Sequence, residues 1–136
     1  MLATVLALTM LSSGAANAQR NDEKKVSVSL RAQPPVGFPP LKVRVTVEIK
    51  GGAEDSSDLY CPRVEWDWGD DLTSQRSEDC DPYVAGKSTI QRRYSAEHTY
   101  NEQGTFSVRF RLKQGSKVVA SASTNVQVRD GLRDDF

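Results

Sequence analysis

Few side chains in this sequence of 136 residues have the type and spacing that catalysis requires. The chain has one histidine, His98, and two cysteines, Cys61 and Cys80. A general acid–base site needs titratable groups held in a pocket, and a nucleophile needs a partner base. No serine or cysteine stands in a motif of that kind, so we expect no enzyme activity.

The two cysteines are expected to pair as a disulfide. They do not form a Cys-x-x-Cys motif, and turn-forming or polar residues flank them: Pro62 follows Cys61, while Asp79 and Asp81 surround Cys80. On the chain-entropy model, a bridge closing roughly twenty residues adds about 3 kcal/mol. Two buried free thiols are the alternative. Two cysteines and one histidine are too few for a structural zinc site.

Acidic side chains gather in two loops, which raises the hypothesis of a weak calcium site. Calcium binds several oxygen ligands, and carboxylates from neighbouring loops can supply them. The alternative, which we favour because no EF-hand spacing is present, is a solvated acidic loop balanced by Arg63, Arg76 and Lys87. No other cofactor is expected. The candidate ligands are Asp70, Asp71, Asp79 and Asp81, in a wider set with Glu54, Asp55, Asp58 and Glu78.

The overall charge excludes one class of partner. Eighteen basic and eighteen acidic residues give a formal net charge of zero, so no global field draws the chain to nucleic acid. Two surface sets stay open as binding candidates. Tyr60, Tyr83 and Phe38 are loop aromatics that could meet a glycan, although they are scattered in sequence. The basic set, for an acidic partner or simply solvated, is Lys42, Arg44, Lys50, Arg109, Arg111 and Lys113.

Residues 1–18 are typical of a signal peptide. They carry no charge, contain an apolar run from Leu2 to Leu8 and end in Ala16-Asn17-Ala18, an A-x-A cleavage pattern. A buried N-terminal helix is the alternative. The run is too short to span a bilayer, and the polar segment 19–25 follows it. We therefore expect an exported protein, periplasmic or extracellular, with no membrane span.

Beyond residue 25, alternation of apolar and polar residues with a period of two predicts strands with one buried face. Prolines between 34 and 40 require a turn, 69–82 reads as a long loop, and 114–116 as a hairpin turn. Such a chain predicts an all-β, two-layer antiparallel sandwich of about seven strands over 26–129, with a charged tail at 130–136. A closed barrel is the alternative. The expected strands cover 26–32, 41–50, 63–68, 90–94, 106–113 and 118–128.

The parity of these strands predicts the core. Val64, Trp66 and Trp68 share one face, so both tryptophans are expected to be buried. The strand at 90–94 is expected at a sheet edge, where Arg92 and Arg93 discourage edge-to-edge pairing. In the last strand, the residues expected to point inward are Val118, Ala120, Ala122, Thr124, Val126 and Val128.

Two motifs resemble the polycystic-kidney-disease (PKD) domain family. The first, from Val64 to Asp70, contains Trp66-Asp67-Trp68-Gly69-Asp70 and is similar to the family's Trp-Asp-Phe-Gly-Asp, with Trp68 replacing the usual Phe. The second, from His98 to Val108, resembles the family's His-x-Tyr followed by Gly and an alternating strand. The chain departs from the family at Asp71, where Gly is usual, and in its long loop with Cys80.

The resemblance implies an immunoglobulin-like sandwich in which the motif residues have structural roles. Asp67 and Asp70 flank Gly69, which can take a positive φ, so both carboxylates are expected to cap the turn. Tyr100, two residues after His98 and shortly before Gly104, corresponds to a tyrosine corner, whose hydroxyl bonds the backbone.

PKD-like domains serve as adhesion, spacer or interaction modules, so the resemblance implies a non-catalytic module that binds an envelope or extracellular protein. One alternative is a carbohydrate-binding module that acts with separate polysaccharide-degrading enzymes. A weak calcium-binding surface domain is the second alternative. The sequence predicts no oligomeric state.

Overall fold

The computed structural model describes residues 26–52 and 56–131. The predicted signal peptide (1–18), the polar segment 19–25 and residues 132–136 of the predicted tail lie outside the described residues, as do Glu54 and Asp55. Within the described ranges, no helix is long and apolar enough to cross a bilayer.

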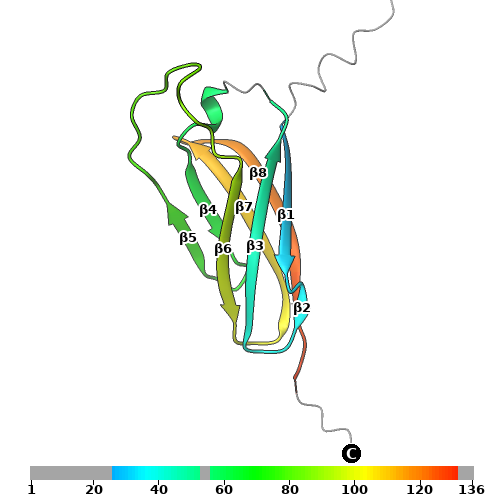
Figure 1. Ribbon diagram of the computed structural model, residues 1–136. Coiled ribbons are helices and arrows are strands. Elements are labelled where there is room, and N and C mark those ends of the chain that lie inside the picture. The colour runs from blue at the N-terminus through cyan, green and yellow to red at the C-terminus, as the bar shows by residue number, and fades with distance from the viewer. Residues whose placement is uncertain (1–25, 53–55, 132–136) are drawn as a thin grey trace, which may run out of the picture.

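Two β-sheets pack face to face (Figure 1). One has the strand order β1-β3-β6 and the other β2-β8-β7-β4-β5. Because the sheets share no strand, the fold is a two-layer sandwich rather than a closed barrel, which confirms the predicted fold class. The strands are β1 (Ser27–Gln33), β2 (Val36–Gly37), β3 (Leu41–Lys50), β4 (Arg63–Asp67), β5 (Thr73–Arg76), β6 (Arg93–Tyr100), β7 (Gly104–Gln114) and β8 (Lys117–Val128), with the 3₁₀ helix η1 (Ser57–Leu59) before β4.

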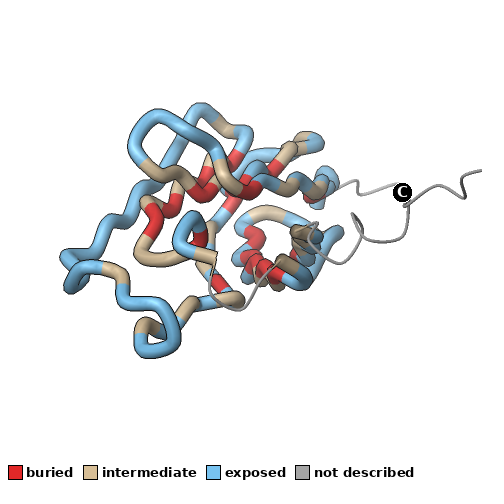
Figure 2. The backbone as a smooth tube through the Cα atoms, turned by 90° about the horizontal axis from the view of Figure 1, so that it is seen from above, coloured by how far each residue is buried: buried red, intermediate tan, exposed pale blue. Residues whose placement is uncertain are grey.

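The core lies between the sheets and follows the predicted alternation. Figure 2 shows the buried segments between the two layers and the exposed segments around them. Burial of each such aliphatic or aromatic side chain contributes about 1.5–3 kcal/mol, so this layer is the main stabilising element of the fold. The central buried side chains come from β3 (Leu41, Val43, Val45, Val47 and Ile49) and β7 (Val108, Phe110 and Leu112).

Both tryptophans lie in this core, as predicted. Trp66 is 6% exposed and Trp68 is 3% exposed. Their rings are parallel, with centroids 5.5 Å apart, and Trp66 also contacts Phe110 at 4.8 Å. The tryptophan pair therefore joins the end of β4 to the part of the core around Phe110 of β7.

The prediction of a continuous loop at 69–82 was wrong, because β5 forms within it. All four β5 residues are exposed, and the strand pairs antiparallel with β4. A strand without a buried face has no apolar alternation, so its sequence carries no strand signal. β5 forms because its backbone pairs with the otherwise free edge of β4.

The predicted strand at 90–94 was also misplaced, since β6 covers Arg93–Tyr100 and Ile90 lies before it. The inward positions of β6 include Ala96 and His98, which give a weak apolar pattern. The edge position is as expected, because β6 pairs only with β3. At this edge Arg93 forms an ion pair of 3.2 Å with Glu48.

The proline-rich segment turns, yet it also contributes β2, which runs parallel to β8. The sequence predicted an antiparallel sandwich, and this parallel pairing departs from that prediction. Prolines are compatible with this pairing because the segment contributes carbonyl acceptors to it, and proline lacks only the N–H donor. The N–H of Gln127 donates to the carbonyl of Pro35 and that of Arg129 to Gly37, both at 2.8 Å.

The parity predicted for β8 fails at its start. Val118 was expected inside but is 46% exposed, whereas Val119 packs partly against the core. A register shift between Leu112 and Lys113 of β7 marks a β-bulge here, which inserts one residue and reverses the parity. From Ala120 onward the predicted alternation holds.

One side of the sandwich ends in two edge strands, β5 from one sheet and β6 from the other (Figure 1). Residues 77–92 connect these strands and so cross from one sheet to the other. The opposite side is closed more tightly, because β1 packs beside β8. The β5–β6 side is therefore where loop residues can approach the core.

Candidate functional site

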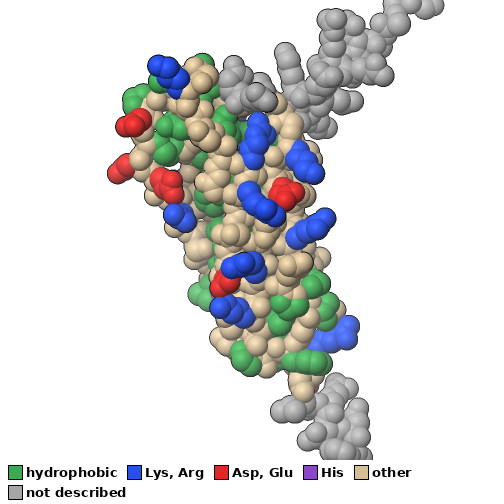
Figure 3. Space-filling model, viewed as in Figure 1, with side chains coloured by type: hydrophobic (Ala, Val, Ile, Leu, Met, Phe, Trp, Pro, Cys, Tyr) green, Lys and Arg blue, Asp and Glu red, His purple; other side chains and the backbone are tan. Residues whose placement is uncertain are grey.

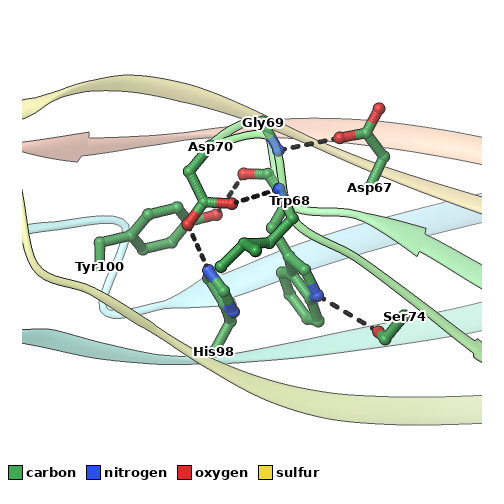
Figure 4. A network of polar contacts seen from close by, with 8 residues as sticks. Asp67, Trp68, Gly69, Asp70, Ser74, His98 and Tyr100 are labelled. Atoms are coloured by element: carbon green, nitrogen blue, oxygen red, sulfur yellow. Dashed lines mark hydrogen bonds and ion pairs between the residues drawn. The ribbon is translucent and has the colours of Figure 1, made fainter.

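The turn after β4 is closed by the two aspartates of the first motif (Figure 4). Oδ1 of Asp67 accepts the backbone N–H of Gly69 at 3.0 Å, and Oδ1 of Asp70 accepts that of Leu72 at 3.2 Å. The N–H of Trp68 donates to the carbonyl of Leu72 at 3.0 Å. These bonds fix the chain reversal between β4 and β5.

Gly69 is required by both conformation and space. Its φ is +80°, and a Cβ at this position would lie 2.6 Å from the carbonyl oxygen of Ser107. The turn therefore rests directly on the backbone of β7. Asp71 also has a positive φ, of 65°, a conformation that aspartate tolerates better than most residues.

Asp70 also binds His98, the only histidine of the chain. Oδ2 of Asp70 lies 2.6 Å from Nε2 of His98, and the two side chains are 19% and 13% exposed. The imidazole stacks on Trp68 with centroids 4.7 Å apart and contacts Tyr100 edge-on at 4.8 Å. The pair thus ties the β4–β5 turn to β6 across the sandwich.

Tyr100 forms the corner at the end of β6. Its hydroxyl donates to the carbonyl oxygen of Trp68 at 2.7 Å, and the residue is 1% exposed. Burial, with smaller effects of Asp70 and Asp67, raises its pKa well above the ordinary value, so the hydroxyl stays a donor. The ring stacks on Phe106 at 4.5 Å. Gly104, with a φ of 152°, begins β7 just before that ring.

Asp70, His98 and Tyr100 are residue types found in acid–base sites, but their contacts here stabilise the fold. The oxygens of Asp70 bind a backbone N–H and an imidazole, and the Tyr100 hydroxyl binds a carbonyl. His98 is enclosed by two aromatic rings. A general acid or base must reach a substrate, and these groups reach one another instead.

The four aspartates proposed for calcium are not brought together. Asp70 and Asp71 lie in the turn that joins β4 to β5, whereas Asp79 and Asp81 lie in the segment that follows β5. Because β4 and β5 are antiparallel, these two segments are at opposite ends of the strands. Among the described residues, no group of three or more metal-ligating side chains could hold an ion.

The predicted disulfide is confirmed. Cys61, just before β4, is bonded to Cys80, with their Cα atoms 6.3 Å apart. The bond secures the start of the 77–92 segment against the beginning of β4. Further along, Ser88 Oγ accepts the N–H of Val84 at 2.8 Å, so this segment has internal structure of its own.

Two of the three loop aromatics meet at this end. The rings of Tyr60 and Tyr83 are tilted, with centroids 5.4 Å apart. The hydroxyl of Tyr60 donates to the carbonyl of Asp81 at 2.7 Å, which fixes its ring beside the disulfide. Phe38 is 59% exposed and lies beside Gly131, away from this pair.

The basic residues that the sequence grouped together are divided by the fold between two surfaces. Lys42, Arg44 and Lys50 belong to β3, while Arg109 and Arg111 belong to β7, in the other sheet. They therefore lie on opposite outer faces of the sandwich. Lys113, also on β7, forms an ion pair of 3.0 Å with Glu65, and its hydrogen bond lowers the pKa of that carboxyl.

Sequence reasoning missed a hollow of about 190 Å³ on the β5–β6 side. Its residues come from the approach to β4, the end of β5, the 77–92 segment and the start of β6. No spacing pattern relates these segments, so no sequence signal could have found the set. The lining residues are Tyr60, Cys61, Pro62, Val64, Arg76, Glu78, Cys80, Thr89, Gln91 and Tyr94, and we call this site the β5–β6 hollow.

Comparison with known proteins gives structural similarity without a sequence match. No protein-family model and no curated protein matches the chain. Among solved structures, it is similar to the PKD domain of an M14-like peptidase from Thermoplasmatales archaeon SCGC AB-540-F20, with a TM-score of 0.49 and 14% sequence identity. That similarity covers 74% of this chain and 91% of the other. The fold assignment rests on the order of the strands in the two sheets.

Proposed function

We propose that the chain is an exported, non-catalytic interaction module that binds an acidic protein of the cell envelope or extracellular space. The binding surface is the outer face of the β1-β3-β6 sheet. The observation that carries the proposal is an excess of positive charge on that face in a chain whose formal net charge is zero. The basic side chains are Arg31, Lys42, Arg44, Lys50 and Arg93, against the acidic Glu48 and Glu97.

Figure 3 shows Lys and Arg side chains running along this face, with few acidic side chains between them. Part of the positive charge is balanced: Glu97 binds both Lys42 and Arg44 at 3.1 Å, and the Lys42 contact is the main cause of its lowered pKa. Arg31 and Lys50 are exposed and form no ion pair with a described residue. They leave the face attractive to an acidic partner.

Two observations support export. Residues 1–18 have the pattern of a signal peptide, and the Cys61–Cys80 disulfide belongs to an oxidising compartment. The absence of catalysis is supported by the use of Asp70, His98 and Tyr100 as fold anchors.

The test is a pull-down from envelope and culture-medium fractions of the native cell, with the mature chain as bait. We expect Arg31→Glu with Lys50→Glu to abolish retention of the partner, and added salt to weaken it. The matched control, Arg109→Glu with Arg111→Glu, reverses equal charge on the opposite face and should leave retention unchanged. Equal retention by both variants would contradict the proposal.

Carbohydrate binding is a second candidate function, favoured by the pairing of Tyr60 with Tyr83 beside the β5–β6 hollow. Calcium binding has no such support, because Asp70 and Asp71 are distant along the sandwich from Asp79 and Asp81.

A further inference from the structure

The β5–β6 hollow is lined by side chains that the network at the β4–β5 turn does not use. It opens between the edge strands of the two sheets, and the Cys61–Cys80 disulfide forms part of its wall. Tyr60 is held at this wall from two directions. Its hydroxyl donates to Asp81, and its carbonyl accepts a hydrogen bond from Nε2 of Gln114 at 2.5 Å. The wall is therefore preorganised.

Tyr94 supplies an unusual polar group to this hollow. The residue is 8% exposed and its ring contacts Phe110 with centroids 5.6 Å apart, so its apolar part belongs to the core. Its hydroxyl forms no hydrogen bond with any described residue and is not a fully buried atom, so it is open to the hollow. Burial, and then the charge of Glu78, raises the pKa of Tyr94, so the hydroxyl is neutral and can both donate and accept. The hydroxyl is therefore available to a partner in the hollow.

The other lining groups define the chemistry of that partner. Arg76 and Glu78 form an ion pair of 3.2 Å and so balance each other, which favours a neutral ligand over a charged one. Thr89 and Gln91 add side chains that donate and accept, and Tyr60 adds an aromatic ring. This combination of one aromatic wall and several mixed donors suits a ring with an apolar face and hydroxyl groups at its edge.

Size restricts the ligand further. Pockets for drug-sized molecules have volumes of about 300–1,000 Å³, and this hollow, at about 190 Å³, is smaller. We infer that the β5–β6 hollow binds a single neutral sugar ring, with the Tyr94 hydroxyl at its wall as a hydrogen-bonding group. The inference rests on the second candidate function, carbohydrate binding, and names its ligand class and its site. It concerns a different surface from the protein-binding face, so either proposal can fail alone.

The test is titration of the ¹⁵N-labelled mature chain with free glucose, galactose, mannose and N-acetylglucosamine, and with their methyl glycosides. We expect binding in the millimolar range for at least one sugar, with amide shifts concentrated at Cys80, Thr89, Gln91 and Tyr94. Binding of the methyl glycoside would identify the end of a glycan chain as the source. Binding of the free sugar alone would identify a soluble monosaccharide.

Two variants make the test specific. Tyr94→Phe removes only the hydroxyl and should weaken binding roughly five- to tenfold, the effect of one hydrogen bond. Thr89→Val should weaken it as well, whereas Thr105→Val, at an exposed position on β7, should not. The inference is overturned if no sugar shifts the amides of the hollow, or if Tyr94→Phe and Thr89→Val bind as tightly as the Thr105→Val control. Charge reversal at Arg31 and Lys50 should leave sugar binding intact.

Discussion

The two ends of the sandwich are stabilised by different means. At the β4–β5 turn, polar groups bind one another: Asp67 and Asp70 cap the turn, Asp70 binds His98, and the Tyr100 hydroxyl binds Trp68. At the other end, a covalent bond secures the 77–92 segment, and the Tyr94 hydroxyl, open to the β5–β6 hollow, has no hydrogen-bond partner among the described residues.

This difference shows that residue type alone does not identify a functional site. The histidine–aspartate pair, the usual candidate for chemistry, is enclosed by Trp68 and Tyr100 and serves the fold. At the disulfide end, one cross-link provides stability, so ordinary polar side chains remain available for a ligand. Three experiments test this contrast, and a fourth, on a residue away from both ends, serves as a reference; they follow in order of decreasing expected effect.

Replacement of glycine should be far more costly at the β4–β5 turn than in the 77–92 segment. Gly69 and Gly86 have nearly equal φ values, +80° and +78°, but a Cβ would collide with Ser107 only at Gly69 and would meet nothing at Gly86. We expect Gly69→Ala to lower the free energy of unfolding by about 4 kcal/mol and Gly86→Ala by about 1 kcal/mol. Urea denaturation followed by tryptophan fluorescence measures both. Equal losses would mean that the turn does not rest on β7.

Removal of the disulfide should destabilise the chain by about 3 kcal/mol, since the bond joins cysteines 19 positions apart in sequence. The double variant Cys61→Ser with Cys80→Ser and the reduced native chain should unfold at similar urea concentrations. Reductant should have no effect on the double variant, which serves as the control. If the oxidised native chain and the double variant were equally stable, the cross-link would not be what secures this end.

The two buried tyrosines should respond differently to loss of the hydroxyl. Tyr100→Phe leaves the Trp68 carbonyl without its donor and should cost about 1–3 kcal/mol. Tyr94→Phe removes a hydroxyl that has no described partner, so in the absence of ligand the unfolding free energy should change by less than about 0.5 kcal/mol. Thermal unfolding by circular dichroism compares them. A large loss at Tyr94 would show that its hydroxyl serves the fold too.

The smallest effect concerns Glu65, on an outer face away from both anchors. Its contact with Lys113 lowers the pKa of the carboxyl below its ordinary value, so the folded state favours the charged form. This contribution is complete above the unfolded pKa and disappears as the pH falls through the folded value. We expect Glu65→Gln to cost less than about 1 kcal/mol at pH 7 and nothing below pH ~3, by urea denaturation at both pH values. A difference that grew in acid would contradict this assignment.

Strands with one buried face could be predicted, and those without one could not. β3 and β7 alternate large apolar and charged side chains, and their predicted faces are the observed ones. β5 has no buried residue, and β6 places Ala96 and His98 inward, so the pattern fails or weakens there. At Val118 a β-bulge changed which side chains of β8 point inward, and no local sequence pattern indicates that bulge.

The candidate sites show the same division. Asp67 and Asp70 cap a turn within two residues of themselves, where short-range geometry limits what a side chain can reach. The bonds of Asp70 to His98 and of Tyr100 to Trp68 join positions 28 and 32 residues apart. The residues that line the β5–β6 hollow are spread from Tyr60 to Tyr94, so the set could not be predicted from the sequence. The basic residues on β3 and β7 looked like one surface until sheet order divided them.

By itself, the sequence determined the fold class, the cysteine pairing and the burial of the tryptophans, because period-two alternation and turn chemistry act over a few residues. Tertiary structure alone decided which loops meet, which charges share a face and which tyrosine hydroxyl opens into a hollow. Those relations depend on how two sheets stack and where their edges fall, and backbone pairing of that kind leaves no mark on local residue order.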